Sequence, residues 1–276
     1  MTGTLYIIAT PIGNLEDITL RALRVLREVD WIACEDTRQT RKLLDHFGID
    51  KPMVSYHEHN EAGRVVDLVE RLTGGGSGAL VSDAGTPLIS DPGYRLVQAA
   101  IAAAVPVVPI PGASAAVSAL SAAGLPTDAF RFCGFLPPKS SQRRKTLEQW
   151  KSETATLIFY ETPHRILEAL VDVTAVMGLR PVVVARELTK VHEEFLRGTA
   201  AELHVELSSR PSVKGEITLL IGKSETIEAD DTPLEKAVST AEQQGLSRME
   251  AIKQVARQRG LSKREVYRLI AGDGGR

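Results

Sequence analysis

The fold of this chain is indicated by one stretch, Leu80-Val81-Ser82-Asp83-Ala84-Gly85-Thr86-Pro87-Leu88-Ile89-Ser90-Asp91-Pro92-Gly93, in which a short apolar run enters a loop of small, turn-forming residues. Two other apolar runs end in the same way, in Thr10-Pro11-Ile12-Gly13-Asn14 and in Pro111-Gly112-Ala113-Ser114-Ala115. Ligands of open α/β sheets bind at the carboxyl ends of the strands. Small residues, glycine above all, let the backbone approach a ligand closely. The three loops therefore predict one crevice at the carboxyl edge of a parallel sheet.

The apolar runs of the first hundred residues alternate with helical patterns, as in βαβ units. A second segment has connections too short for helical crossovers, so we expect part of its sheet to be antiparallel. The expected strands are 5–9, 31–34, 53–56, 79–82 and 105–110 in the first segment, and 130–135, 156–160, 182–187, 193–197 and 216–221 in the second. The fold class is thus α/β, and we place two α/β domains at 1–112 and 113–223.

Composition excludes several classes of protein. The 276 residues are 43% hydrophobic and 25% charged, with a formal net charge of −2, which is ordinary for a soluble globular protein. No apolar run approaches the 18 residues of a membrane span, and the first residues lack a basic signal-peptide head. Cys34 and Cys133 show no metal-type spacing and no disulfide framework. We therefore expect a cytoplasmic protein without a membrane partner.

The last part of the chain differs in charge from the rest. Residues 247–276 contain eight Lys or Arg and three Asp or Glu, a balance of +5, and an acidic linker at 225–231 precedes this region. The capping pattern Ser/Thr-x-x-Glu occurs at Thr232, Ser247 and Ser262, and each occurrence predicts a helix start. We expect a basic appendage of three short helices at 232–276, the last two resembling a helix-turn-helix.

Taken together, ordered blocks over nearly the whole chain resemble the ribosomal RNA small subunit methyltransferase I family, a branch of the tetrapyrrole methylase superfamily. The blocks are Ala9–Leu15, Cys34–Arg38, Ser82–Pro87, Ser90–Gly93, Pro111–Ala115, Phe159–Arg165, Arg186–Lys190 and Lys214–Glu216. The resemblance implies two α/β domains of the tetrapyrrole methylase type, with S-adenosylmethionine in the cleft between them. It also implies methyl transfer to the ribose 2′-hydroxyl of a cytidine in the decoding centre of small-subunit (16S) ribosomal RNA. The superfamily is commonly homodimeric, and we expect no DNA partner.

By the same resemblance, cofactor-binding residues can be assigned. The first domain supplies Asp83, Ala84, Gly85, Thr86, Ser114 and Ala115, and the second supplies Tyr160 and Thr218. The loop reads Ser82-Asp83-Ala84 where superfamily relatives have Gly-Asp-Pro, a departure typical of the ribosomal RNA branch. Thr10 and Pro11 either border the methyl donor or the target ribose, or they form a plain strand-to-helix turn.

The block Glu35-Asp36-Thr37-Arg38 places two carboxylates and a guanidinium at a strand end. One interpretation is that Asp36 or Thr37 only caps the next helix. We favour the interpretation that Glu35, Asp36 and Arg38 serve catalysis, since a carboxylate can accept the proton of a ribose hydroxyl. Arg38 or Arg41 would then hold a flanking phosphate. No residue is firmly assigned as the base, because in-line positioning alone accelerates methyl transfer.

Two basic regions are candidate RNA contacts. The first comprises Lys139, Arg143 and Arg144, for which the alternative is a solvated charged face. The second is in the tail and comprises Lys253, Arg257, Lys263, Arg264 and Arg268, for which the alternative is packing on the body or on a second subunit.

His57-Glu58-His59 suggests a metal, but two histidines without a third ligand make a poor site, and we expect none. Two other functions remain open. One is a tetrapyrrole (corrin-pathway) methyltransferase, and the other is a non-catalytic RNA-binding or ribosome assembly factor that only senses S-adenosylmethionine.

Overall fold

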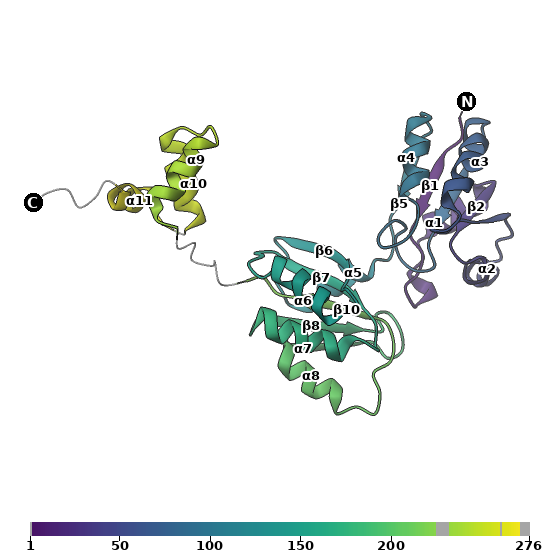
Figure 1. Cartoon of the computed structure of the whole chain (residues 1–276). Coiled ribbons are helices and arrows are strands. Elements are labelled where there is room, and N and C mark those ends of the chain that lie inside the picture. The colour runs from purple at the N-terminus through teal and green to yellow at the C-terminus, as the bar shows by residue number, and fades with distance from the viewer. Residues whose placement is uncertain (1, 225–231, 260, 271–276) are drawn as a thin grey trace, which may run out of the picture. The chain divides into compact units, whose positions relative to one another are not determined.

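The computed structural model describes residues 2–224, 232–259 and 261–270 of the chain, without the side chains of Arg257 and Gln258. The chain forms two compact units, Met1–Gln149 with Ala155–Lys223 and Trp150–Thr154 with Ser224–Arg276. The first unit contains two five-stranded sheets, and the second contains the C-terminal helices (Figure 1). Among the helices in these ranges, none combines the length and the apolarity that crossing a membrane requires.

The first sheet is parallel throughout and has the order β3-β2-β4-β1-β5. Its strands are β1 (Leu5–Ile8), β2 (Trp31–Cys34), β3 (Met53–Ser55), β4 (Gly78–Val81) and β5 (Val107–Ile110). The strand β4 inserts between β1 and β2, so the loops that follow β1 and β4 emerge side by side. The predicted βαβ arrangement is confirmed, and the crossing order places the two loops at the switch point of the sheet.

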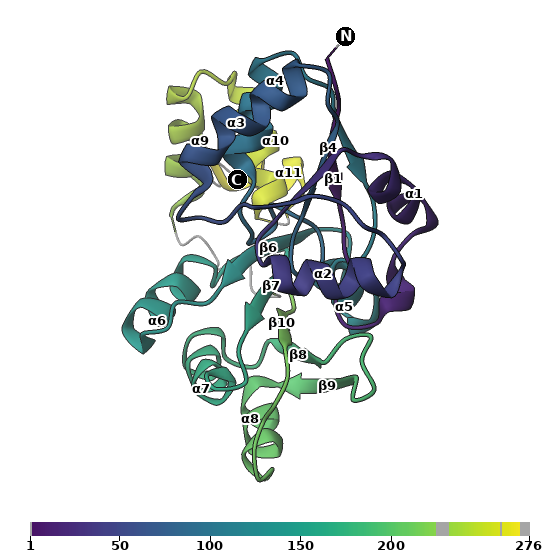
Figure 2. The same ribbon diagram turned by 90° about the vertical axis from the view of Figure 1, so that its right-hand side faces the viewer.

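Helices cover both faces of this sheet because the strand side chains alternate between two cores. Tyr6 and Ile8 pack with α1 and α2, whereas Leu5 and Ile7 pack with α3 and α4. These helices are α1 (Leu20–Glu28), α2 (Thr37–His46), α3 (Glu61–Thr73) and α4 (Tyr94–Ala102). Figure 2 shows α1 on one side of β1 and β4, and α3 and α4 on the other. A short 3-10 helix (Leu15–Asp17) links β1 to α1.

The second sheet is mixed and has the order β6-β7-β10-β8-β9. Only the β6–β7 pair is parallel, which confirms the expectation that part of this sheet is antiparallel. The strands are β6 (Phe130–Phe135), β7 (Thr156–Glu161), β8 (Pro181–Arg186), β9 (Glu194–Thr199) and β10 (Ile217–Ile221). The helix α5 (Ala115–Ala123) buries Ala116, Ala119, Leu120 and Ala123 against one face. The remaining helices are α6 (Ser140–Gln149), α7 (Ile166–Met177) and α8 (Ala200–Ser208).

The C-terminal unit has its own small core. Its helices are α9 (Leu234–Gln243), α10 (Arg248–Gln258) and α11 (Lys263–Ile270), and side chains such as Val238, Ile252 and Val266 are buried between them. At Ser262 the predicted capping box is present, since the Ser262 N–H donates to Glu265 (2.7 Å) and the Glu265 N–H donates to the Ser262 hydroxyl (3.2 Å). Ser247 and Glu250 form the same pair of bonds before α10. The expected acidic linker at 225–231 lies outside the described residues.

Candidate active site

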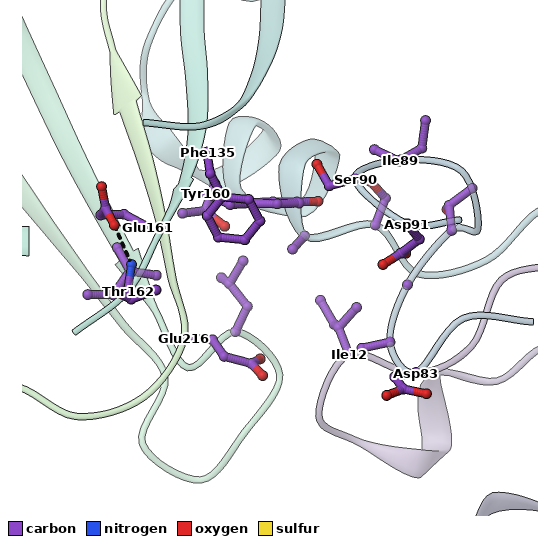
Figure 3. A pocket seen from close by; sticks show the side chains of 18 of the residues that line it. Ile12, Asp83, Ile89, Ser90, Asp91, Phe135, Tyr160, Glu161, Thr162 and Glu216 are labelled. Atoms are coloured by element: carbon purple, nitrogen blue, oxygen red, sulfur yellow. Dashed lines mark hydrogen bonds between the residues drawn. The ribbon is translucent and has the colours of Figure 1, made fainter. Parts of the chain in front are cut away.

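A cavity of about 350 Å³ lies in the first unit, at the carboxyl ends of β1 and β4 and the start of α5. Eight of the ten predicted cofactor residues line it: Asp83, Ala84, Gly85, Thr86, Ser114, Ala115, Tyr160 and Thr218. Figure 3 shows Phe135 and Tyr160 on one wall, and Ile12, Asp83 and Asp91 on the opposite wall. Both sheets of the unit therefore contribute to one cavity, of a size that suits a small-molecule ligand.

Thr10 and Pro11, the other two predicted cofactor residues, do not line the cavity. Thr10 is buried and forms a bridge with Gly85, in which each backbone N–H donates to the other residue's carbonyl at 2.9 and 3.0 Å. Its hydroxyl donates to the Ser82 carbonyl (3.1 Å). The structure thus gives Thr10 the role of fastening the loop after β4 to the loop after β1, and Ile12 is the residue of this segment that reaches the cavity.

The loop between β4 and α4 has an unusual backbone. Gly85 (φ 82°) and Gly93 (φ 139°) have positive φ values, and so do Leu88 (φ 73°) and Ser90 (φ 70°), which carry side chains. A Cβ on Gly93 would lie 2.7 Å from a Leu80 side-chain carbon, so the position also lacks space. Non-glycine residues with positive φ are costly and persist where the surroundings impose them. This loop supplies seven of the cavity's lining residues: Asp83–Thr86, Ile89, Ser90 and Asp91.

The helix α5 begins at the cavity, with Ser114 and Ala115 in the lining. Ser114 precedes the helix, and its side chain makes no capping hydrogen bond. The first N–H groups of a helix lack intrahelical acceptors and carry partial positive charge. The start of α5 is therefore suited to an anionic group of a ligand.

One wall of the cavity is aromatic. The ring of Tyr160 lies edge-on to Phe132 (centroids 4.8 Å apart) and to Phe135 (5.7 Å). The register of β6 against β7 shifts between Phe132 and Phe135, as at a β-bulge. The irregularity accounts for both aromatic residues facing Tyr160, and Phe135 is 53% exposed. Phe135 was not predicted, since an aromatic residue at a strand end usually belongs to a core.

Carboxylates are distributed around this apolar lining. Glu161 has a fully buried side chain whose Oε1 accepts from Arg165 (2.7 Å) and from the Thr162 N–H (2.7 Å). Its Oε2 has no hydrogen-bond partner in the described part of the chain. Glu216 is held by Lys190 (3.0 Å). The cavity therefore offers acceptors for cationic or hydroxyl groups of a ligand as well as the helix start for an anionic one.

A second cavity of about 380 Å³ adjoins the first. Its lining residues are Glu35, Glu58, Glu61, Ser90, Asp91, Pro92, Gly93 and Tyr94. Ser90 and Asp91 belong to both linings. The block Ser90–Gly93 is one of those that carry the family resemblance, but no role for Asp91 followed from the sequence.

The predicted catalytic block divides into different environments. Glu35 lines the second cavity, whereas Asp36 and Arg38 line neither. Asp36 caps α2, since its carboxylate accepts from the Arg38 N–H (2.8 Å), and it also binds the exposed Arg38 guanidinium (2.7 Å). The Asp36 N–H donates to Asp83 (3.0 Å), which connects this block to the loop after β4. The capping interpretation therefore holds for Asp36, and the Arg38 fork is already paired.

The pKa values of these carboxyl groups move in opposite directions. Hydrogen bonds from the Arg38 side chain and backbone lower the pKa of Asp36 to about 2. Burial, followed by the charge of Asp83, raises the pKa of Glu35. Burial, followed by the charge of Glu35, raises the pKa of Asp91 to about 6. Because a base must bind a proton to act, Asp36 is the poorest candidate of the three.

The residues predicted to contact RNA differ in their exposure to solvent. Lys139 is exposed, but Arg143 is 0% exposed and its Nε donates to Asp172 (2.6 Å), with a Nη1 bond to the Pro138 carbonyl (3.2 Å). The prediction of a phosphate contact is therefore wrong for Arg143, because its side chain is buried in a structural ion pair. Arg144 also donates to Asp172 (2.6 Å) while remaining half exposed.

In the C-terminal unit, the predicted residues Lys253, Lys263, Arg264 and Arg268 are exposed. The side chain of Arg257 lies outside the described residues.

His57, from the block considered for metal binding, forms a turn in which its N–H donates to Asn60 Oδ1 (2.9 Å). Among the residues described, no group of three or more His, Cys, Asp or Glu side chains is arranged to hold a metal ion.

Comparison with known proteins identifies the family. A family model described as Tetrapyrrole (Corrin/Porphyrin) Methylases matches residues 4–204. A protein of Halalkalibacterium halodurans named ribosomal RNA small subunit methyltransferase I is 52% identical, over 92% of this chain and 90% of its own length. This chain belongs to the ribosomal RNA small subunit methyltransferase I family of tetrapyrrole methylases. Family members of the same name from Pseudomonas aeruginosa (50% identical; 83% of this chain, 82% of that protein) and Synechocystis (45%; 97% of both) agree.

Solved structures show that the methylase fold extends well beyond this family. A crystal structure of diphthine synthase matches with a TM-score of 0.62 at 18% identity, covering 80% of this chain and 91% of that one. A uroporphyrin-III-C-methyltransferase from Thermus thermophilus matches with a TM-score of 0.53 at 20% identity, covering 81% and 93%. At such identities the likeness shows the fold alone. The predicted fold class, two α/β sheets with a small helical addition, is confirmed.

S-adenosylmethionine is the methyl donor that membership of this methylase family entails. The residues that line the first cavity suit its chemistry. The start of α5 can bind the carboxylate of its methionyl group, and the acceptor-only Glu161 Oε2 can bind an ammonium or hydroxyl group. Apolar side chains such as Ile12 and Leu188 and the aromatic wall can enclose the remainder. These groups would be occupied together by one ligand that carries an anion, a cation and an apolar body.

Proposed function

We propose that this chain transfers a methyl group from S-adenosylmethionine to the ribose 2′-hydroxyl of a cytidine in the decoding centre of small-subunit ribosomal RNA. The observation that carries the proposal is that relatives about half identical over most of the chain are named small-subunit ribosomal RNA methyltransferases. The coarser statement, an S-adenosylmethionine-dependent methyltransferase of small-subunit ribosomal RNA, rests on this directly. The ribose hydroxyl and the cytidine rest on the family resemblance.

When bound, S-adenosylmethionine supplies a methyl group made electrophilic by the attached sulfonium. The chain's own residues position the two partners. Ser114 and Ala115 place the start of α5 at the cavity, and the wall of Phe135 and Tyr160 excludes water from it. Holding donor and acceptor in line is a large part of the catalysis of such a transfer. The strained loop after β4 is part of both cavity walls, which fixes the donor side and the acceptor side relative to each other.

Binding of RNA is assigned to exposed cations that do not belong to the lining of either cavity. In the first unit Lys139 is available, and in the C-terminal unit Lys253, Lys263, Arg264 and Arg268 are exposed. Each phosphate that a cation neutralises adds to the salt dependence of binding. We expect removal of residues 232–276 to weaken RNA affinity and to leave affinity for S-adenosylmethionine unchanged. The homodimer implied by the resemblance stays a prediction, and sedimentation of the full chain would measure it.

The function is tested by incubating the full chain with labelled S-adenosylmethionine and small ribosomal subunits that lack the modification, followed by nucleoside mass spectrometry. We expect 2′-O-methylcytidine to form only when the protein is present, and large subunits in the same assay to stay unlabelled. Transfer to a corrin substrate instead would favour the tetrapyrrole methyltransferase. Saturable donor binding without transfer to subunits or naked ribosomal RNA would favour the sensing role and overturn the proposal.

A further inference from the structure

Asp91 occupies a place that no other carboxylate shares among the residues the structure describes. The first cavity has the carboxylates Asp83, Asp91, Glu161 and Glu216 in its lining, and the second has Glu35, Glu58, Glu61 and Asp91. Asp91 is the one that belongs to both. In Figure 3 it lies on the wall across from Tyr160, in the loop after β4. A group that acts on both a methyl donor in the first cavity and an acceptor in the second must lie at this boundary.

The second cavity has the chemistry of a nucleoside site rather than of a phosphate site. Its polar side chains are mainly carboxylates, which accept hydrogen bonds from hydroxyl and amino groups and repel phosphate. Glu61 is already paired with Arg95 (2.8 Å). Tyr94 is 65% exposed at the edge of the cavity, and RNA-binding proteins stack unpaired bases on such aromatic side chains. A sugar hydroxyl entering this cavity would meet acceptors, Asp91 among them.

The other carboxylates of the region have different tasks. Asp36 caps a helix and binds Arg38, and Asp83 accepts the Asp36 N–H (3.0 Å). Glu35 lines the second cavity but not the first. Proton abstraction has to occur at the oxygen that receives the methyl group, so the base must reach the point where the two ligands meet. Of the carboxylates in the part of the chain that the structure describes, only Asp91 lines both cavities and so satisfies this condition.

We propose that Asp91 is the general base of the methyl transfer. The inference rests on the proposed function and names the residue that accepts the proton of the acceptor hydroxyl. As the acceptor oxygen forms its bond to the methyl carbon, the bond between carbon and sulfur breaks and its electron pair remains on sulfur. The hydroxyl proton passes to a carboxylate oxygen of Asp91 and from there to water. The products are a methyl ether, a neutral thioether and one released proton, so charge and atoms balance.

The surroundings of Asp91 suit this task. Burial raises its pKa most, the charges of Glu35 from the end of β2 and of Asp83 from its own loop add to this, and a hydrogen bond with the Ser82 side chain opposes it. Glu58 and Glu61 face the same cavity from the segment before and at the start of α3, and Tyr160 lies across the first cavity. With a pKa of about 6, Asp91 is ionised at neutral pH and binds a proton more tightly than an ordinary aspartate. We expect turnover to rise with pH through an inflection near 6.

The test compares wild type with Asp91→Asn, which keeps the shape of the side chain and removes the base. We expect the kcat on small subunits to fall by about 10²–10⁴-fold, the range typical of general-base catalysis, and the inflection near pH 6 to disappear. Affinity for S-adenosylmethionine, measured by calorimetry, should stay within about threefold. Asp67→Asn is the matched control, because Asp67 is on α3, where it pairs with Arg71 (3.0 Å) outside both cavities.

A second readout does not depend on activity. In the apo protein labelled with ¹³C at aspartate carboxyls, one resonance should titrate near pH 6 and be missing from the Asp91→Asn spectrum. A loss of kcat below tenfold, or an inflection that persists in Asp91→Asn, would overturn the proposal even if the NMR assignment holds. Wild type that fails to methylate any subunit would overturn the proposed function instead, so the two failures are distinguishable.

Discussion

The loop after β4 and the start of α6 are both rich in charge, yet the structure uses the two sets of charges in opposite ways. In the loop, Asp83 and Asp91 line cavities. In α6, Arg143 is buried against Asp172, which is itself 2% exposed and also receives Arg144 and the Ser140 hydroxyl (2.9 Å). One set of charges is available to a ligand, and the other is satisfied within the protein.

The pKa values of two aspartates express this difference. Burial acts to raise the pKa of both Asp91 and Asp172. For Asp172, hydrogen bonds from Arg144, Arg143 and Ser140 outweigh burial and hold the pKa below its usual range. For Asp91, the nearest charges are carboxylates, and its pKa rises to about 6. A partly buried carboxylate with like-charged neighbours, such as Asp91, is typical of a functional site, whereas a buried and fully paired one, such as Asp172, is typical of a structural ion pair.

The largest effect should come from breaking the compensated pair. Arg143→Ala removes a fully buried guanidinium from Asp172, which keeps only Arg144 and the Ser140 hydroxyl, and leaves the space of the lost side chain empty. We expect the free energy of unfolding in urea to fall by about 3–5 kcal/mol. Lys139→Ala is the matched control for the RNA hypothesis. We expect it to change stability by less than about 0.5 kcal/mol and to lower the salt dependence of RNA binding by about one phosphate contact. Stability near wild type in Arg143→Ala would contradict the structural role assigned to the pair.

A smaller effect of opposite sign should come from the uncompensated carboxyl group. The pKa of Asp91 is higher in the folded chain than in an unfolded one, so its contribution to stability is greatest below about pH 4 and is lost as the pH rises through 6. We expect Asp91→Asn to be more stable than wild type by at most about 3 kcal/mol at pH 8, and by about half of that at pH 5. Urea unfolding at the two pH values measures the difference. A variant less stable than wild type at pH 8 would show that Asp91 is compensated as Asp172 is.

The smallest effect should come from replacing a glycine of positive φ by alanine, once in the loop after β4 and once outside the cavity. Gly85 (φ 82°) lines the cavity, and a Cβ there would lie 3.4 Å from Ile12, whereas Gly48 (φ 60°) has nothing within 4 Å. Alanine at either position should cost about 1 kcal/mol of stability, because L-residues disfavour positive φ. Only Gly85→Ala should also weaken S-adenosylmethionine binding, by several-fold in calorimetry. Equal donor affinities for the two variants would remove Gly85 from the binding wall.

The sequence by itself determined the strands, the parallel and mixed character of the two sheets, and the loops that form the first cavity. These features depend on local pattern, since apolar runs of strand length and the turn residues after them are visible in single segments such as Leu80–Gly93. Eight of the ten cofactor residues expected from the family resemblance line the cavity. Six of them follow strands of the parallel sheet, which brings its carboxyl strand ends to one edge, whereas Tyr160 and Thr218 belong to the second sheet.

Only the tertiary structure decided which charges face a ligand. Arg143 and Lys139 are both basic residues of one short segment, yet the first meets Asp172 on α7 and the second meets solvent. Asp36 and Asp91 both follow strands of the first sheet, yet a guanidinium neutralises one while the charge of Glu35 raises the pKa of the other. Arg38 is a local partner, two residues from Asp36, but Asp172 is 29 residues from Arg143, and Glu35 lies on another loop than Asp91. These latter partners come together only when helices and loops pack. The energy of a charge depends on these neighbours and on burial, which no single segment specifies.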